Sequence, residues 1–454
     1  MKMRIERDSL GEVEVSCDVY WGAQTQRSYQ NFPKGLDLMP REQIMALVLI
    51  KKAAALVNFK LGILDERRKE LIVYAADRLL GGEFSDNFPL TVWQTGSGTQ
   101  TNMNVNEVIG HIANEKAGAL LIHPNDHVNK SQSSNDTFPT AIHLASLNLL
   151  EHDLLPEIDK FVGQLAKKAK SFTGIIKTGR THLQDATPLK LSDEIGTYGE
   201  IIYRDKLYLE KLMEDLRLLP IGGTAVGSGL NAPDGFSTMM VEELSALSGL
   251  ALLEDENKFL GLSSKQAVGR VHSGLRLLAE DLNKIANDLR FLSCGPRTGI
   301  GELILPANEP GSSIMPGKVN PTQVEMLTMI AMQVLANDTA ISLANASGQL
   351  ELNTYMPLII YNMVRSIKLL AEGMQAFRKN LLENLEVNSE KIQENLDKSL
   401  MLVTALSPHI GYDKAAELAK YAHKKKLSLR QANRDLDFVS DEEFVRIVDP
   451  QKMV

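Results

Sequence analysis

The chain has 454 residues, a formal net charge of −8 at pH 7, and 44% hydrophobic but only 6% aromatic residues. Lysine and arginine form no block, which argues against a nucleic-acid partner. Its two cysteines, Cys17 and Cys294, are too few for a disulfide framework or a thiolate metal site. No apolar run approaches the roughly 18 residues that span a bilayer, and the first residues hold no apolar signal region. The sequence therefore predicts a cytoplasmic protein without a membrane segment.

A core of Leu, Ile, Val, Ala and Met favours helices over strands, so we expect a mainly α fold. Residues 1–132 mix short helical patterns with polar loops and predict a mixed, mostly helical domain, with helices over 43–61 and 66–80. Residues 133–389 predict a central long-helix bundle, and 390–454 a small C-terminal helical domain. Five long helices are expected, over about 154–165, 201–219, 268–292, 323–343 and 361–385.

The third of these helices carries apolar residues at alternating intervals of three and four, from Val268 to Leu292. This spacing is typical of a bundle seam. Helices of this length expose much apolar surface unless other chains cover it. We therefore expect an exposed seam and an oligomer.

Four polar islands interrupt the helical pattern. In the first, Gln94–Asn104, the hydroxyls of Ser97 and Thr99 and the free N–H groups of a helix start would form an anion cradle. The alternative is a plain loop in which a serine or threonine caps the helix through Val105–Ile109.

The second island joins His123-Pro-Asn-Asp126 to Ser133-Ser134-Asn135. The first part is typical of an Asx-type turn. Helix capping accounts for one of the three short polar side chains in the second part, but hardly for all three. The spacing of His123, Asp126 and His127 matches no strong zinc pattern, so no metal site is predicted.

The third island, Thr178–Pro188, holds His182, either a catalytic group or a satisfied structural histidine. The fourth, Gly311–Pro321, is a loop shaped by glycine and proline, and its hydroxyls, amide and ammonium suit a carboxylate or a developing oxyanion. Glu325 follows it, and either favours a helix N-terminus or orients a histidine. The glycine-dense turn Gly222–Gly229 lacks a dinucleotide fingerprint and is interpreted as a structural reversal.

The run Gly311-Ser-Ser-Ile-Met-Pro-Gly-Lys-Val-Asn-Pro321, followed by Thr322-Gln323, resembles the fumarase/aspartase superfamily of lyases, and class II fumarases in particular. All four islands share that likeness in order and spacing. The likeness extends over nearly the whole chain, from Asp8 to Val454. The resemblance implies a three-domain fold with a central long five-helix bundle. It also implies a homotetramer in which four bundles form a twenty-helix core and each active site draws on three chains.

The resemblance further implies a role for each matching residue. His182, paired with Glu325, works through water, and Ser312 is the base that takes the C3 proton. Substrate carboxylates are bound by Ser97, Gly98, Thr99, Ser133, Ser134, Asn135, Thr181, Ser313, Lys318 and Asn320. A second dicarboxylate site would use His123, Asn125 and Asp126, but Leu120 stands where some relatives carry an arginine, which weakens this expectation. Ser228 in place of a common threonine is a mild departure.

The expected activity is reversible hydration of fumarate to (S)-malate by anti addition of water through an aci-carboxylate carbanion, without a metal or organic cofactor. Aspartate ammonia-lyase is the alternative within the superfamily. Gly317, His182 and Asp126 favour the fumarase, because aspartases usually carry Ala, Gln and Thr at these positions. A non-catalytic structural member of the superfamily is the other alternative, and the intact candidate residues argue against it.

Overall fold

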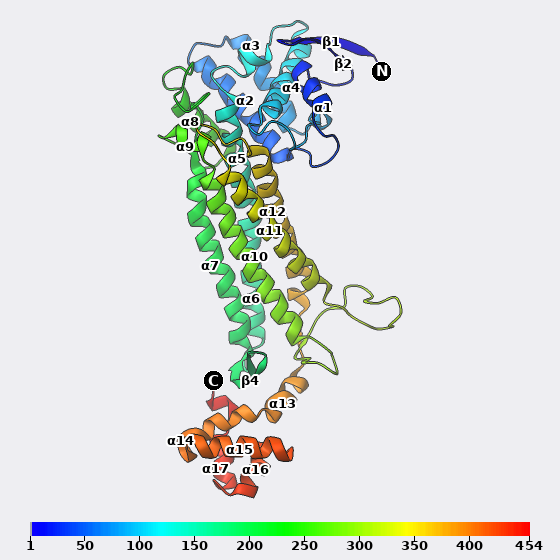
Figure 1. The fold of residues 1–454 in the computed structure, drawn as a ribbon, viewed down its shortest axis with the longest axis vertical. Coiled ribbons are helices and arrows are strands. Elements are labelled where there is room, and N and C mark those ends of the chain that lie inside the picture. The colour runs from blue at the N-terminus through cyan, green and yellow to red at the C-terminus, as the bar shows by residue number, and fades with distance from the viewer. Residues whose placement is uncertain (1) are drawn as a thin grey trace. The chain divides into compact units, whose positions relative to one another are not determined.

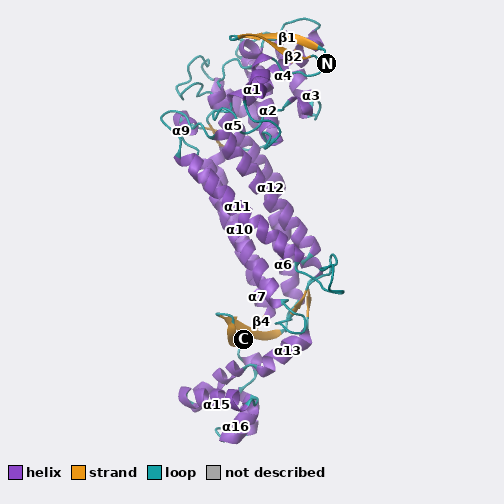
Figure 2. Ribbon diagram, turned by 45° about the vertical axis from the view of Figure 1, so that its right-hand side comes forward, coloured by secondary structure: helices purple, strands orange, loops and turns teal. Residues whose placement is uncertain are grey.

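The computed structural model describes residues 2–454, which form seventeen α-helices and eight short strands (Figures 1 and 2). The predicted mainly α class is confirmed. Two compact units divide the chain. The first unit comprises the chain up to Pro156 with Asp205–Ala279 and Ala331–Ala371, and the second comprises Glu157–Arg204, Glu280–Ile330 and Glu372–Val454. The domain boundaries predicted at 132 and 389 stay predictions.

Helix α2 is the centre of the N-terminal part of the first unit, where it packs against α3, α4, α5 and α8. Its central residues Leu47, Val48 and Ile50 are fully buried because apolar residues occupy every face of this stretch. The elements here are β1 Met3–Asp8, β2 Gly11–Ser16, α1 Ala23–Asn31, α2 Arg41–Lys60, α3 Glu66–Leu80, α4 Thr99–Ala117, α5 Ser134–Leu149, β5 Leu218–Leu219, α8 Phe236–Ser248, β6 Leu253–Glu254 and α9 Lys258–Ser263.

Five long helices are present, as predicted: α6 Leu155–Ser171, α7 Leu191–Arg217, α10 Gln266–Leu292, α11 Thr322–Ala346 and α12 Met356–Asn380. Four predicted bounds are wrong by five residues or more. Helix α6 ends at 171 and not at 165, and α12 begins at 356 and not at 361. Helix α7 begins ten residues before 201, because its first turn is polar and shows no apolar period. The last helix ends at Asn380, because the apolar residues after it continue as a short 3-10 turn, Leu382–Asn384. Within each unit the long helices lie side by side (Figure 1).

The seam on α10 is buried by the chain itself: Val268, Leu275 and Leu282 are inaccessible to solvent. The expectation that this seam is exposed is therefore wrong. The exposed apolar side chains lie on α11 instead, where Met329, Met332 and Leu343 are 63%, 66% and 65% exposed. By length and composition alone α11 is the one helix within residues 2–454 that could cross a membrane, which is weak evidence because core helices pass the same test.

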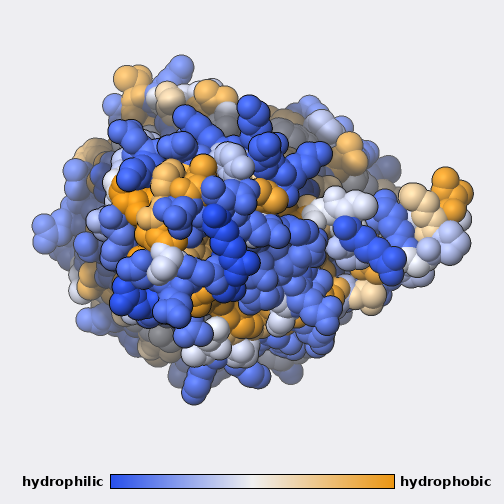
Figure 3. Space-filling view, turned by 90° about the horizontal axis from the view of Figure 1, so that it is seen from below, coloured by the Kyte–Doolittle hydropathy of each residue, from blue (hydrophilic) through white to orange (hydrophobic). Residues whose placement is uncertain are grey.

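The second unit holds two small sheets that the sequence did not reveal. Strands β3 Ile176–Thr181 and β4 Gln184–Lys190 form an antiparallel hairpin, and β7 Leu303–Ile304 pairs with β8 Glu386–Val387. The predicted helical C-terminal part is present as α13 Ser389–Lys398, α14 Ser407–Ile410, α15 Tyr412–Lys425, α16 Leu429–Leu436 and α17 Asp441–Ile447. Leu406, Leu418 and Ala432 lie at its buried centre. The face in Figure 3 is mostly hydrophilic, with smaller apolar patches.

Candidate active site

The start of α4 presents a row of hydroxyls. Gly98 precedes the helix with φ 71°, and a Cβ there would lie 2.2 Å from Phe138 Cδ2, so only glycine fits. The Ser97 Oγ lies 2.8 Å from Thr99 Oγ1, which lies 2.8 Å from Ser134 Oγ. No side chain caps this helix. The alternative in which a serine or threonine is the cap is therefore wrong, and these hydroxyls remain available to a ligand.

The second half of the cradle is built by the start of α5. Ser133 caps this helix in a capping box with Asp136, while Asn135 Nδ2 donates to Ala225 O at 2.8 Å. Capping thus accounts for one of the three polar side chains, as expected. Asp136 also accepts from the N–H groups of Gly222 and Thr224, at 2.9 and 3.0 Å. Asp136 thereby holds the glycine-dense turn Gly222–Gly229 against the start of α5.

Burial raises the pKa of Asp136 to about 6, against the lowering effect of its backbone hydrogen bonds. A second buried charge lies nearby on α2, where Lys51 Nζ donates to Asn129 Oδ1 at 2.9 Å and to Gln132 Oε1 at 3.0 Å. Burial lowers the pKa of Lys51 to about 7. Neither side chain was among the predicted site residues. In the sequence, Lys51 could have been noticed because it is a charged residue within the apolar run that forms α2.

His182 lies at the tip of the β3–β4 hairpin. Thr181 pairs with Gln184, so the loop consists of His182 and Leu183 alone, with φ 56° and 59°. Two positive φ values in a two-residue loop are the type I′ pattern, which normally uses Asn-Gly. The side chains of Thr181 and His182 are exposed. The sequence predicted a break between helices here and not a hairpin.

The Gly311 loop is closed by its own hydrogen bonds. Gly311 N donates to Lys318 O at 2.9 Å, and Asn320 Nδ2 donates to Gly311 O at 2.6 Å. Ser312 Oγ accepts from the N–H groups of Ile314 and Met315, at 3.3 and 3.1 Å. The side chains of Ser313 and Lys318 are exposed.

Glu325 lies in the first turn of α11 with its side chain exposed. Within residues 2–454, no hydrogen bond or ion pair joins His182, Ser312 and Glu325 to one another.

The His123 turn is satisfied by its own side chains. His123 caps a π-helical turn, Pro124–Val128, and its Nδ1 lies 3.2 Å from Asp126 Oδ2. The His123 N–H donates to His127 Nδ1 at 2.8 Å. Leu120 nearby is 94% exposed. The carboxylate of Asp126 adds negative charge where a dicarboxylate would have to bind.

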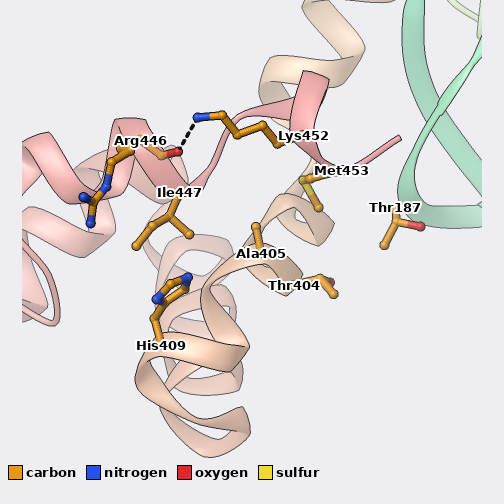
Figure 4. A pocket seen from close by; sticks show the side chains of 8 residues that line it. All are labelled: Thr187, Thr404, Ala405, His409, Arg446, Ile447, Lys452 and Met453. Carbon is orange, nitrogen blue, oxygen red and sulfur yellow. Dashed lines mark hydrogen bonds between the residues drawn. The ribbon is translucent and has the colours of Figure 1, made fainter.

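A cavity of about 540 Å³ in the second unit holds none of the predicted residues (Figure 4). Its lining includes Thr187, Thr404, His409, Arg446, Ile447 and Lys452. Lys452 Nζ donates to Arg446 O at 3.1 Å. Within residues 2–454, no three His, Cys, Asp or Glu side chains cluster as a metal site.

The sequence matches the lyase family over residues 11–336 and the fumarase C C-terminus over residues 402–454. Over its full length it is 52% identical to the class II fumarate hydratase of Campylobacter jejuni, of which it covers 99%. The chain belongs to the class II fumarase family. The class II fumarate hydratase of Bacillus subtilis is 50% identical, again over the whole chain and 99% of that protein.

Solved structures agree with this assignment to the class II fumarases. A class II fumarase from Schistosoma mansoni is 41% identical and superposes with a TM-score of 0.98, covering 100% of this chain and 99% of the other. The resemblance seen in the four islands is therefore confirmed at the level of family and fold. As a class II fumarase, the chain is a hydro-lyase.

Proposed function

We propose that the chain converts fumarate reversibly to (S)-malate and that the four islands carry the reaction. This proposal rests on the 52% identity, over the full length of the chain, with a class II fumarate hydratase. The row of hydroxyls at the start of α4 supports it. A dicarboxylate needs donors at both ends. The hydroxyls of Ser97, Thr99 and Ser134 are the donors proposed for one carboxylate.

Other residues of the two cradle loops have different tasks. The Ser133 hydroxyl accepts from Asn135 N, and the Asn135 amide donates to Ala225. Both therefore shape the loop while offering their remaining polar atoms to substrate. Gly98 contributes space, and we assign Thr181 to the substrate from its place beside His182.

The base proposed for the C3 proton is Ser312. A serine needs its alkoxide form stabilised, and two loop N–H groups already donate to its Oγ. Removing the proton builds negative charge on the neighbouring carboxylate. Ser313, Lys318 and Asn320 would bind that charge, and each fixed donor of this kind lowers a barrier by roughly 3–4 kcal/mol. Loss or addition of water on the opposite face is assigned to His182, with Glu325 as its partner.

Assembly is the second part of the proposal. The exposed methionines and leucine of α11 form an apolar face that a single chain leaves uncovered. A homotetramer with a twenty-helix core would cover it. We also propose that each site is shared between three chains, which agrees with the lack, within residues 2–454, of a hydrogen bond or ion pair joining His182, Ser312 and Glu325.

Two finer points stay part of the proposal. A second dicarboxylate site at His123, Asn125 and Asp126 would be weak, because the Asp126 carboxylate is itself negatively charged and Leu120 is apolar. A cytoplasmic location is supported by Cys17 and Cys294, which are exposed free thiols of the kind kept in reducing compartments.

Product analysis tests the function. The purified protein is incubated with fumarate alone and with fumarate plus ammonium. Malate in both mixtures supports the proposal, whereas aspartate without malate would assign an ammonia-lyase.

We propose no metal or organic cofactor, so dialysis against a strong chelator should leave the rate unchanged. A loss of rate restored by a divalent ion would contradict that part.

A further inference from the structure

The hairpin tip that carries His182 is strained. Leu183 is a bulky residue with φ 59°, a left-handed conformation that is unfavourable for such a side chain. Its side chain is 65% exposed, so little burial of apolar surface offsets that cost. Something else in the hairpin must hold the tip in place.

A buried carboxylate that contacts β3 at Lys177 and Arg180 provides the hold. Glu302 accepts from Arg180 through both oxygens, with Nη2–Oε1 at 2.7 Å and Nη1–Oε2 at 3.1 Å. Lys177 Nζ lies 3.3 Å from Glu302 Oε2, and Asn395 Nδ2 donates to Oε1 at 3.1 Å. The side chains of Lys177 and Glu302 are each 1% exposed, so water does not compete for these contacts.

The two cations reach one carboxylate because of a bulge. Residues three apart on a regular strand point to opposite faces of the sheet. The register shifts between Thr178 and Arg180, which brings Lys177 and Arg180 to the same side. Gly179 permits this, since a Cβ there would lie 2.5 Å from Thr187 O.

Glu302 is itself fixed by its backbone. Its N–H donates to Leu292 O at 2.8 Å, at the end of α10, and its carbonyl accepts from Asn388 N at 2.9 Å. The same stretch of chain continues through β7 to Ser312. Burial tends to raise the pKa of Glu302, but Arg180 and Lys177 outweigh it and hold that pKa below its usual value. The carboxylate is therefore charged at neutral pH.

We propose that Glu302 is a positioning residue for the reaction: through Arg180 and Lys177 it fixes the strained tip that presents His182, and it anchors the segment that leads to Ser312. This rests on the proposed role of His182. A misplacement of about 1 Å in a reacting group can lower a rate about a hundredfold. This clamp, Glu302 with Arg180 and Lys177, should act on turnover more than on binding, because Thr181 is the one assigned substrate ligand on the hairpin, whereas the hydroxyl cradle lies on α4 and α5.

The test compares Glu302→Gln with Glu383→Gln. The control removes the exposed carboxylate of Glu383 from its ion pair with Arg378 in the same unit. Glu302→Gln should lower kcat about tenfold to a hundredfold while KM changes less than about twofold. Glu383→Gln should keep both constants. A kcat within about twofold of wild type, with only the melting temperature lowered, would show a purely structural role and overturn the proposal.

A milder variant guards against loss of folding. Arg180→Lys keeps the charge but loses the two-pronged contact, and it should lower kcat by less than Glu302→Gln. The double variant should lose no more than the worse single variant, because both act through one contact. Fully multiplicative losses would show that the two residues act separately and would contradict the clamp.

Hydrogen exchange does not depend on catalytic activity, so it tests the role of Glu302 separately from the proposed function. Hydrogen exchange of the backbone amides of 176–190 should be faster in Glu302→Gln than in Glu383→Gln, with the amides of α4 unchanged. Unchanged exchange in the hairpin would overturn the clamp even in an active enzyme. A wild-type protein that makes no malate would overturn the proposed function, while the exchange result still decides whether Glu302 holds the hairpin.

Discussion

Replacing Gly98 by alanine should destabilise the protein and weaken substrate binding together. The new Cβ would lie 2.2 Å from Phe138 Cδ2, a ring that is fully buried and cannot move aside freely. The left-handed backbone at φ 71° adds its own cost. The expected loss is about 2–5 kcal/mol, from about 1–2 kcal/mol for a left-handed alanine and about 1–3 kcal/mol for overpacking.

Gly118 at the other end of α4 is the matched control. It has φ 66°, but a Cβ there would meet nothing within 4 Å. Gly118→Ala should therefore lose only the backbone part, about 1–2 kcal/mol. Urea unfolding followed by circular dichroism measures both losses. Because Gly98 separates Ser97 from Thr99, only Gly98→Ala should also raise KM. Equal losses in the two variants, with equal KM, would refute the argument from the Phe138 contact.

Three further predictions concern the proposed mechanism. Ser312→Ala should lower kcat by at least about a hundredfold, the low end for loss of a general base, with an unchanged circular dichroism spectrum; near-normal kcat would remove it from the mechanism. Glu325→Gln should keep KM and lower kcat, since an amide still hydrogen-bonds His182 but does not stabilise its charged form; a collapse of affinity at normal kcat would instead identify a helix cap. Inactive His182→Ala and Ser312→Ala chains, refolded together, should recover about a quarter of wild-type activity by random assortment; mixed tetramers without recovery, checked by light scattering, would place both residues in one chain.

The apolar period in the sequence predicted the long helices well because burial on one face selects it directly. The β3–β4 hairpin escaped prediction because its loop is His182-Leu183 and not a glycine-containing turn, and because Gly179 and Pro188 suggest a broken segment. The prediction that the apolar seam on α10 is exposed was also wrong. Sequence shows that a face is apolar, but not whether the same chain or another one covers it.

The sequence indicated the polar clusters that the structure brings together, as at Ser97–Thr99 and Ser133–Asn135. It did not indicate the supporting charges, because their partners are distant in sequence. Lys51 contacts residues 78 and 81 positions away, and Glu302 lies 122 positions from Arg180. A single charged residue within an apolar run does not indicate which distant group will pair with it.

The apolar face of α11 has a consequence for cells that make more than one such enzyme. Two of its most exposed residues are Met329 and Met332, and methionine side chains readjust to surfaces of different shape. A face of this kind distinguishes poorly between a copy of itself and a related chain. In the proposed tetramer with shared sites, co-expressed relatives would therefore exchange subunits, and a damaged copy would reach the sites of its healthy neighbours.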